Sequence, residues 1–231
     1  MVRNILKIAF LFSFIGLIGC AHVQKPIQMD TSYLSANNGK IGVAIAKAPE
    51  AGYQPLGNIG LLDFAIISGA TGELTDHLKT LNSKDFSRVK DTAIKVLTQK
   101  GIKTVSIEEE IDLSLLPDTS GKDGFAARDF ASIKKKYDIT SLLVLRLSSY
   151  GIKRNYYGFI PTTEPNSYAS IEGQLIDLNT NVLKWHYSEN LEDSIAQPWD
   201  EPEAQFPNVT NGIYHTIEKS SFAIKQSLIK G

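Results

Sequence analysis

The chain of 231 residues contains one cysteine, Cys20, which directly follows an apolar run at residues 8–19. A single thiol cannot form an intramolecular disulfide, so packing alone must stabilise the fold. The run is also too short to span a bilayer, since a spanning helix needs about 20 apolar residues. Arg3 and Lys7 precede it. A basic start and an apolar run ending in small residues are typical of a secretory signal, and we expect residues 1–19 to be cleaved.

Leu17, Ile18, Gly19 and Cys20 resemble the lipobox of bacterial lipoprotein precursors. The resemblance implies that Cys20 receives a diacylglyceryl group on sulfur and an N-acyl chain, which would be the only cofactor. Several acyl chains hold a domain firmly on a membrane, whereas one binds only marginally. Ala21 in place of Asp implies, by the enterobacterial sorting pattern, an outer-membrane location facing the periplasm. The alternative, a secreted protein with an incidental cysteine, leaves the position of that cysteine unexplained.

The charge balance argues against a nucleic-acid partner. Removal of the leader leaves 22 Lys and Arg residues against 25 Asp and Glu residues, a net charge of about −3, whereas nucleic-acid binding needs clustered basic residues. The basic triplet at 134–136 falls in the last turn of a predicted helix, where the helix dipole favours cations. The 212 remaining residues suit one domain with a full core.

After a predicted flexible tether at 20–39, the pattern alternates between strands and helices. We expect strands at 40–46, 102–107 and 141–147, and a hairpin formed by 168–178 and 183–187. We expect helices from Asn82 to Gly101, over 126–137, and from Asn208 or Thr210 onward. Two buried stripes are predicted on the first and last helices: Phe86, Val89, Ala93, Val96 and Leu97, and Ile213, Ile217, Ser220, Ile224 and Leu228.

The order of these elements defines the expected fold class. Strands joined through helices tend to run parallel, whereas the two strands of a hairpin run antiparallel. We therefore predict a single α/β domain at residues 40–231, with a mixed β-sheet of about five strands and helices packed on its faces.

Two segments carry apolar side chains without a clear period. Residues 61–67 form a run that we interpret as a buried loop or a short helix; exposed, it would mark a partner site. Residues 148–166 are expected to form a loop whose tyrosines could stack on a glycan or peptide, seat a neighbouring subunit, or fold back on the core. The candidate interaction surface comprises Leu61, Leu62, Phe64, Tyr150, Tyr156, Tyr157 and Phe159.

A second resemblance covers about residues 40–190. Residues 137–147, then 176–180, then Leu183, Lys184 and Trp185 resemble the helix, core strand and hairpin of periplasmic lipoproteins. These include the curli secretion channel family and envelope lipoproteins that share the amino-terminal fold of the translocation protein TolB. The resemblance implies a non-catalytic envelope protein that assembles, often as a ring. The sequence lacks the paired amphipathic strands that a membrane pore of this family needs. A pore is therefore disfavoured, and the protein could still form a periplasmic ring, a collar or an adaptor.

Residues that could support catalysis follow no familiar pattern. His22, His77, His186 and His215 lack a metal-binding spacing, and the carboxylates at 108–112 lack the pattern of a calcium loop. Glu189, Glu192 and Asp193 would form an acid–base pair only if they converged in a cleft; otherwise they are solvated residues at a strand end.

We therefore expect a membrane-anchored assembly or interaction protein that is not an enzyme, working as a homo-oligomer or with an envelope protein partner. The alternative is a periplasmic hydrolase, or a lipoprotein that binds a small ligand or glycan. That alternative predicts a deep cleft with converging polar groups.

Overall fold

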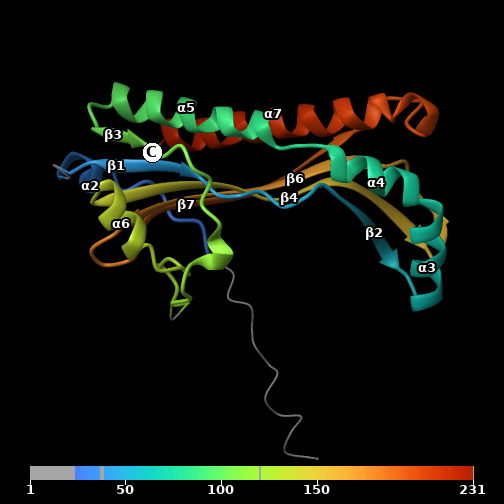
Figure 1. Ribbon diagram of the computed structural model, residues 1–231, viewed down its shortest axis with the longest axis horizontal. Helices are drawn as coiled ribbons and strands as arrows, with labels where there is room; N and C mark the ends of the chain where they lie inside the picture. The colour runs from blue at the N-terminus through green and yellow to red at the C-terminus, as the bar shows by residue number, and fades with distance from the viewer. Residues whose placement is uncertain (1–23, 37–38, 120, 231) are drawn as a thin grey trace, which may run out of the picture.

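A seven-stranded mixed β-sheet organises the protein in a computed structural model that describes residues 24–36, 39–119 and 121–230 (Figure 1). Cys20 and the rest of the predicted lipobox lie outside the described residues. The strands are β1 (Ile41–Ile45), β2 (Gly52–Asn58), β3 (Thr104–Ser106), β4 (Ser141–Tyr157), β5 (Ile160–Pro161), β6 (Asn166–Asp177) and β7 (Val182–Ser194). The helices are α2 (Thr31–Ala36), α3 (Leu61–Ala70), α4 (Gly72–Thr80), α5 (Lys84–Gln99), α6 (Ala131–Tyr137) and α7 (Pro207–Lys230).

The sheet has the order β3-β1-β4-β6-β7, with β2 and β5 also paired to β4. β1 runs parallel to β3 and β4, whereas β6 runs antiparallel to both of its neighbours, β4 and β7. The predicted fold class is therefore confirmed, and β2 and β5 join the sheet beyond the five strands that we expected. The predicted hairpin is β6–β7, and both of its strands are longer than expected.

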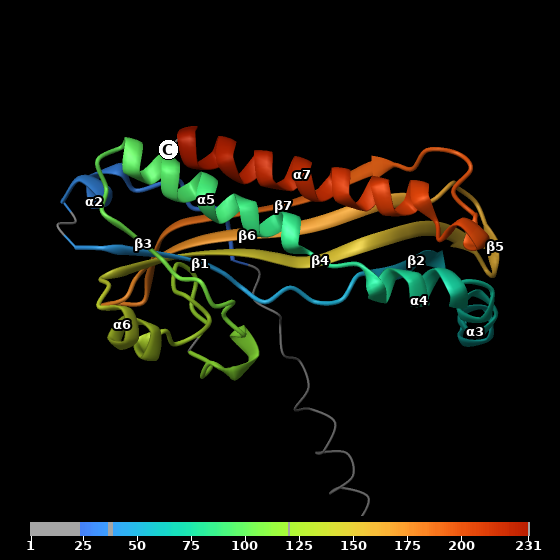
Figure 2. The same cartoon turned by 45° about the horizontal axis from the view of Figure 1, so that its top comes forward.

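Helices α5 and α7 lie side by side on one face of the sheet (Figures 1 and 2). Both helices bury the stripes predicted from the sequence, together with Leu143, Leu145 and Leu147 of β4. A second core lies on the opposite face, beneath α6 and the loop before it, and includes Ile107, Phe130, Ile133, Leu142 and Val144. Helix α6 starts later than the predicted 126, because Ala126 N donates to Asn181 O at 3.0 Å and holds that segment against the hairpin.

Strand β4 continues far beyond the expected 141–147. Residues 148–157, predicted as loop, pair with β6 on one side and with β2 on the other. Gly151 makes this possible, because its φ of +143° suits glycine and because a Cβ there would lie 1.9 Å from Gly52 O. The prediction was wrong because Gly151 and the basic residues Lys153 and Arg154 obscure the alternation of the strand.

The amino-terminal segment belongs to the domain rather than to a flexible tether. Ile27 exchanges two backbone hydrogen bonds with His186 of β7, at 2.9 and 3.0 Å, and Asp30 N donates to Lys184 O at 2.9 Å. Helix α2 follows and buries Leu34. The domain therefore includes residues 24–36 and extends much closer to Cys20 than the predicted boundary at residue 39.

Gly173 provides a test of the core packing. A Cβ at this position would lie 2.4 Å from Trp185 Cη2, and Trp185 is among the most deeply buried side chains. We expect Gly173→Ala to lower the free energy of unfolding by about 1–3 kcal/mol, because the added methyl overpacks the core. In the control Gly69→Ala, the new Cβ meets nothing within 4 Å, and alanine favours a helix by up to about 1 kcal/mol. Urea denaturation that gave both variants the wild-type stability would contradict this packing.

Candidate functional site

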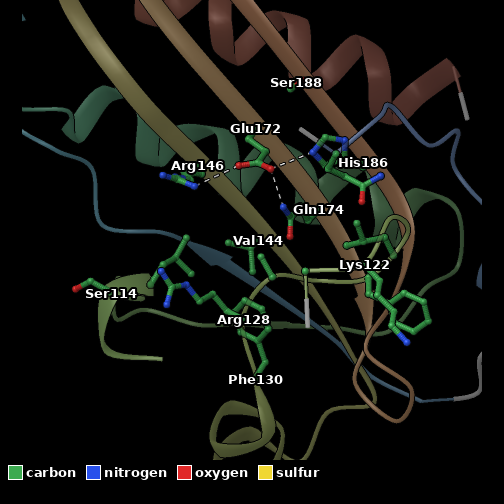
Figure 3. A pocket seen from close by; sticks show the side chains of 16 residues that line it. Ser114, Lys122, Arg128, Phe130, Val144, Arg146, Glu172, Gln174, His186 and Ser188 are labelled. Carbon is green, nitrogen blue, oxygen red and sulfur yellow. Dashed lines mark hydrogen bonds and ion pairs between the residues drawn. The ribbon is translucent and has the colours of Figure 1, made fainter. Parts of the chain in front are cut away.

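A cavity of about 560 Å³ opens on the sheet face opposite α5 and α7 (Figure 3). Two rows of side chains from neighbouring strands form its floor: Arg146, Glu172 and Ser188, and next to them Val144, Gln174 and His186. The centre of the floor is polar, because each of the three strands β4, β6 and β7 contributes at least one polar side chain to it. A strand face that packed against a hydrophobic core would carry apolar side chains there instead. On the other face, the same part of the sheet buries mainly apolar side chains, among them Leu143, Leu145 and Trp185, so the polar residues distinguish the cavity face.

The loop between β3 and α6 provides the walls of the cavity. Phe125 and Phe130 contribute apolar surface, while Lys122 and Arg128 contribute positive charge. Arg128 is already engaged, since it pairs with Asp118 at 2.5 Å and donates to Leu116 O at 3.1 Å. Gln24 lies at the rim and accepts a hydrogen bond from Gly124 N at 2.9 Å.

Glu172 and His186 form a buried polar pair on the floor. Glu172 Oε1 lies 3.0 Å from His186 Nε2 and 2.7 Å from Gln174 Nε2, and Oε2 lies 3.4 Å from Arg146 Nη1. Burial works to raise the pKa of Glu172, but the hydrogen bonds from His186 and Gln174 and the charge of Arg146 outweigh it and hold the pKa below its usual value. The carboxylate is therefore charged at neutral pH.

His186 also ties the amino-terminal segment to the floor. Its Nδ1 lies 3.1 Å from the carbonyl oxygen of Lys25, and its Nε2 faces Glu172. Both partners are acceptors, so the ring can donate to both only when it carries two protons. The His186 ring thus bridges the Glu172 carboxylate and the backbone next to the rim.

The predicted interaction residues divide into two groups. Leu61, Leu62 and Phe64 lie on α3, and Tyr157 and Phe159 lie on the β4–β5 turn; all five are exposed, Leu61 by 89%, Leu62 by 74% and Tyr157 by 72%. Residues 61–67 thus form a short helix, as expected, but the expected burial was wrong. Two further exposed residues belong to the same place, and we define the apolar end as Leu61, Leu62, Phe64, Ile66, Tyr157, Phe159 and Ile160.

Tyr150 and Tyr156 do not belong to this surface. They are only 2% and 7% exposed, and the Tyr156 hydroxyl lies 2.6 Å from that of Tyr53. The reason is the pleat of β4, which turns these two residues to the interior while Tyr157 points outward. The alternative that the tyrosines of this segment fold back on the core is thus confirmed for Tyr150 and Tyr156.

The carboxylates considered for acid–base catalysis each meet a different partner. Asp193 accepts from His215 Nδ1 at 2.7 Å and from Lys219 Nζ at 2.6 Å, whereas Glu192 pairs with Lys153 and Glu189 accepts from Tyr187. They are therefore not assembled into one acid–base pair.

The acidic run at 108–112 makes surface contacts. Glu108 pairs with Lys90 at 2.9 Å and Glu109 with Lys136 at 2.6 Å, as a solvated turn would. Across residues 24–36, 39–119 and 121–230, no group of three His, Cys, Asp or Glu side chains is placed to hold a metal ion.

Comparisons with known proteins give structural similarity alone. No protein-family profile and no curated protein sequence matches the chain. Among solved structures, it is similar to a Xanthomonas campestris protein, with 8% identity, 83% of this chain and 84% of that chain covered, and a TM-score of 0.37.

A minor lipoprotein from Acinetobacter baumannii has 10% identity over 83% of this chain and 90% of its own, with a TM-score of 0.36. The PelC dodecamer from Paraburkholderia phytofirmans has 9% identity over 78% and 83%, with a TM-score of 0.29. At these scores the similarity carries no conclusion about function.

The Glu172–His186 pair predicts a specific pH dependence. Because the folded pKa of Glu172 lies below its ordinary value of 4.5, its charge stabilises the fold above that pH, and the stabilisation is lost as the pH falls through the lower folded value. We expect Glu172→Gln to reduce the free energy of unfolding by about 1–3 kcal/mol at pH 7. The difference in the free energy of unfolding between the variant and the wild type should become smaller at acidic pH. The matched control is Glu218→Gln, at an exposed position of α7. If urea denaturation gave wild type and Glu172→Gln the same dependence of the free energy of unfolding on pH, that result would contradict the pairing of Glu172 with His186.

Proposed function

We propose that the protein is a lipid-anchored component of the bacterial cell envelope that works by binding and not by catalysis. Acyl chains on Cys20 hold it at the outer membrane, facing the periplasm, after cleavage of residues 1–19. The observation that carries the proposal is the apolar end. Isolated exposed apolar residues are ordinary, but a cluster from two separate segments marks an interaction surface.

The two segments of the apolar end are held together by local contacts. Gly158 N, in the β4–β5 turn, donates to Asn58 O at the end of β2, at 3.0 Å. A Cβ built at Gly158 would lie 3.5 Å from Asp63 Oδ1 in the first turn of α3. The turn and the helix therefore present one continuous surface, whose exposure in water is unfavourable by about 25 cal/mol for each Å² of apolar area.

The short distance in sequence between Cys20 and Gln24, which belongs to the domain, supports an anchor close to the domain. Three residues lie between Cys20 and Gln24, and the four steps from one Cα to the next span at most about 14 Å in any conformation. Acyl chains on Cys20 would therefore hold the domain against the membrane surface. This revises the sequence-based expectation of a domain that stands off on a long tether.

The cavity favours a second candidate function, the binding of a small ligand. It has converging polar groups and apolar walls, the combination that ligand sites share. Arg146 on the floor keeps 43% of its side chain exposed, so a ligand with an anionic group for Arg146 and an apolar body for Phe130 fits the cavity. We expect octanoate to raise the thermal midpoint of the wild type but not of Arg146→Gln, and octanol to have less effect. Equal shifts in both proteins would argue against this candidate.

Intact-mass analysis tests the anchor directly. We expect the protein, produced with its own leader in an enterobacterial host, to start at Cys20, to carry the mass of the acyl groups and to fractionate with the outer membrane. Cys20→Ser should lack that mass. In the matched control Ala21→Asp, the acyl mass should remain while the protein moves to the inner membrane. A free thiol or a retained leader in the wild type would overturn the proposal.

A further inference from the structure

Helix α3 has an unusual distribution of apolar side chains. Of its ten residues, only Ile67 is buried, while Leu61, Leu62, Phe64 and Ile66 are all exposed. Consecutive residues are turned by about 100° around a helix axis, so the four exposed side chains spread over about 200° of the circumference. Ile67 occupies the remaining face. A helix that is apolar all round requires an apolar environment all round. A flat protein surface would cover only one of its faces.

The outward surface of α3 also lacks charge. Asp63 is the only ionisable residue between positions 59 and 72. Its carboxylate turns back and accepts a hydrogen bond from Gly60 N at 2.9 Å, which leaves the apolar side chains as the exposed part of the helix. Insertion of this surface therefore has a single charge to accommodate, the partly exposed carboxylate of Asp63 in the first turn of the helix.

The β4–β5 turn extends the same surface with interfacial residues. Tyr157 and Phe159 are exposed there, beside Ile160. Aromatic side chains of this kind are enriched where a protein crosses from the headgroup region to water. Helix α3 and the turn thus combine an aliphatic tip with an aromatic edge, as interfacial membrane anchors do.

The position of Gln24 brings this surface to a bilayer. Gln24 lines the cavity, on the side of the sheet opposite α5 and α7, and α3 extends toward that same side at the far end of the molecule (Figures 1 and 2). The loop before α6 lies on that side too, and it exposes Leu115. With Cys20 within about 14 Å of Gln24, a membrane that holds the acyl chains also faces α3.

We propose that α3 and the β4–β5 turn insert into the periplasmic interface of the same bilayer that holds the acyl chains of Cys20. The inference rests on the proposed function and names the partner of the apolar end: a lipid surface. At about 15 Å in length, α3 is too short to span the hydrocarbon, so it lies in the interfacial region. No helix in the described part of the chain combines the length and apolar composition of a membrane span.

A fluorescent probe on α3 tests the insertion. Leu62→Cys and, as the matched control, Ser87→Cys on the exposed side of α5 are purified as full acylated proteins, labelled with an environment-sensitive NBD dye, and reconstituted into phosphatidylethanolamine–phosphatidylglycerol vesicles. The acylated sulfur of Cys20 is a thioether and does not react, so each protein carries one label. We expect a blue shift at position 62, with quenching by doxyl-labelled lipid that persists at high salt, and neither effect at position 87.

Three outcomes would be distinguishable. A probe at position 62 as solvated as the one at position 87 would overturn the insertion. A blue shift without lipid quenching would also overturn it, because it would show burial against protein, either a second copy or another partner. The intact mass of the same samples reports acylation independently, so loss of the anchor and failure of the insertion are separate results.

Discussion

Backbone hydrogen bonding along β4 is the interaction on which the rest of the structure depends. This strand of 17 residues pairs with β6 over nearly its whole length, while its other edge pairs first with β1 and then with β2. The amino-terminal half of β4 lies between the two cores. Its carboxyl-terminal half carries β2 and leads into the β4–β5 turn. The close approach at Gly151 and Gly52 joins the two halves into one sheet.

The same strand connects the two candidate sites. Val144 and Arg146, in its first half, form part of the cavity floor, and Tyr157, at its end, belongs to the apolar end. The segment that starts at Gln24 lies at the rim of the cavity and is held there by His186. In the arrangement that we propose, the protein would have two contacts with a membrane, the acyl chains near the cavity and α3 at the far end, with the polar cavity floor on the side that faces the lipid.

The sequence predicted those parts of the fold that depend on local periodicity. The stripes of α5 and α7 and the polar turn of the β6–β7 hairpin are visible in a single segment. Strand β2 and the second half of β4 were missed, because Gly52, Pro55 and Gly151 weaken the local signal and the pairing partner lies about a hundred residues away. The cavity was missed for a related reason: Arg146, Glu172 and His186 meet only through strand register. The sequence shows that α3 is apolar, but not that it is exposed. Its exposure depends on which other parts of the chain pack against it, and the local sequence does not show those contacts.

Neutron reflectometry of the acylated protein on a supported bilayer tests the central claim, that acyl chains and α3 together hold the domain on the membrane. The account predicts protein density that begins within the headgroup layer and continues into the domain without an intervening layer of water. A continuous water layer between the headgroups and the domain would contradict it.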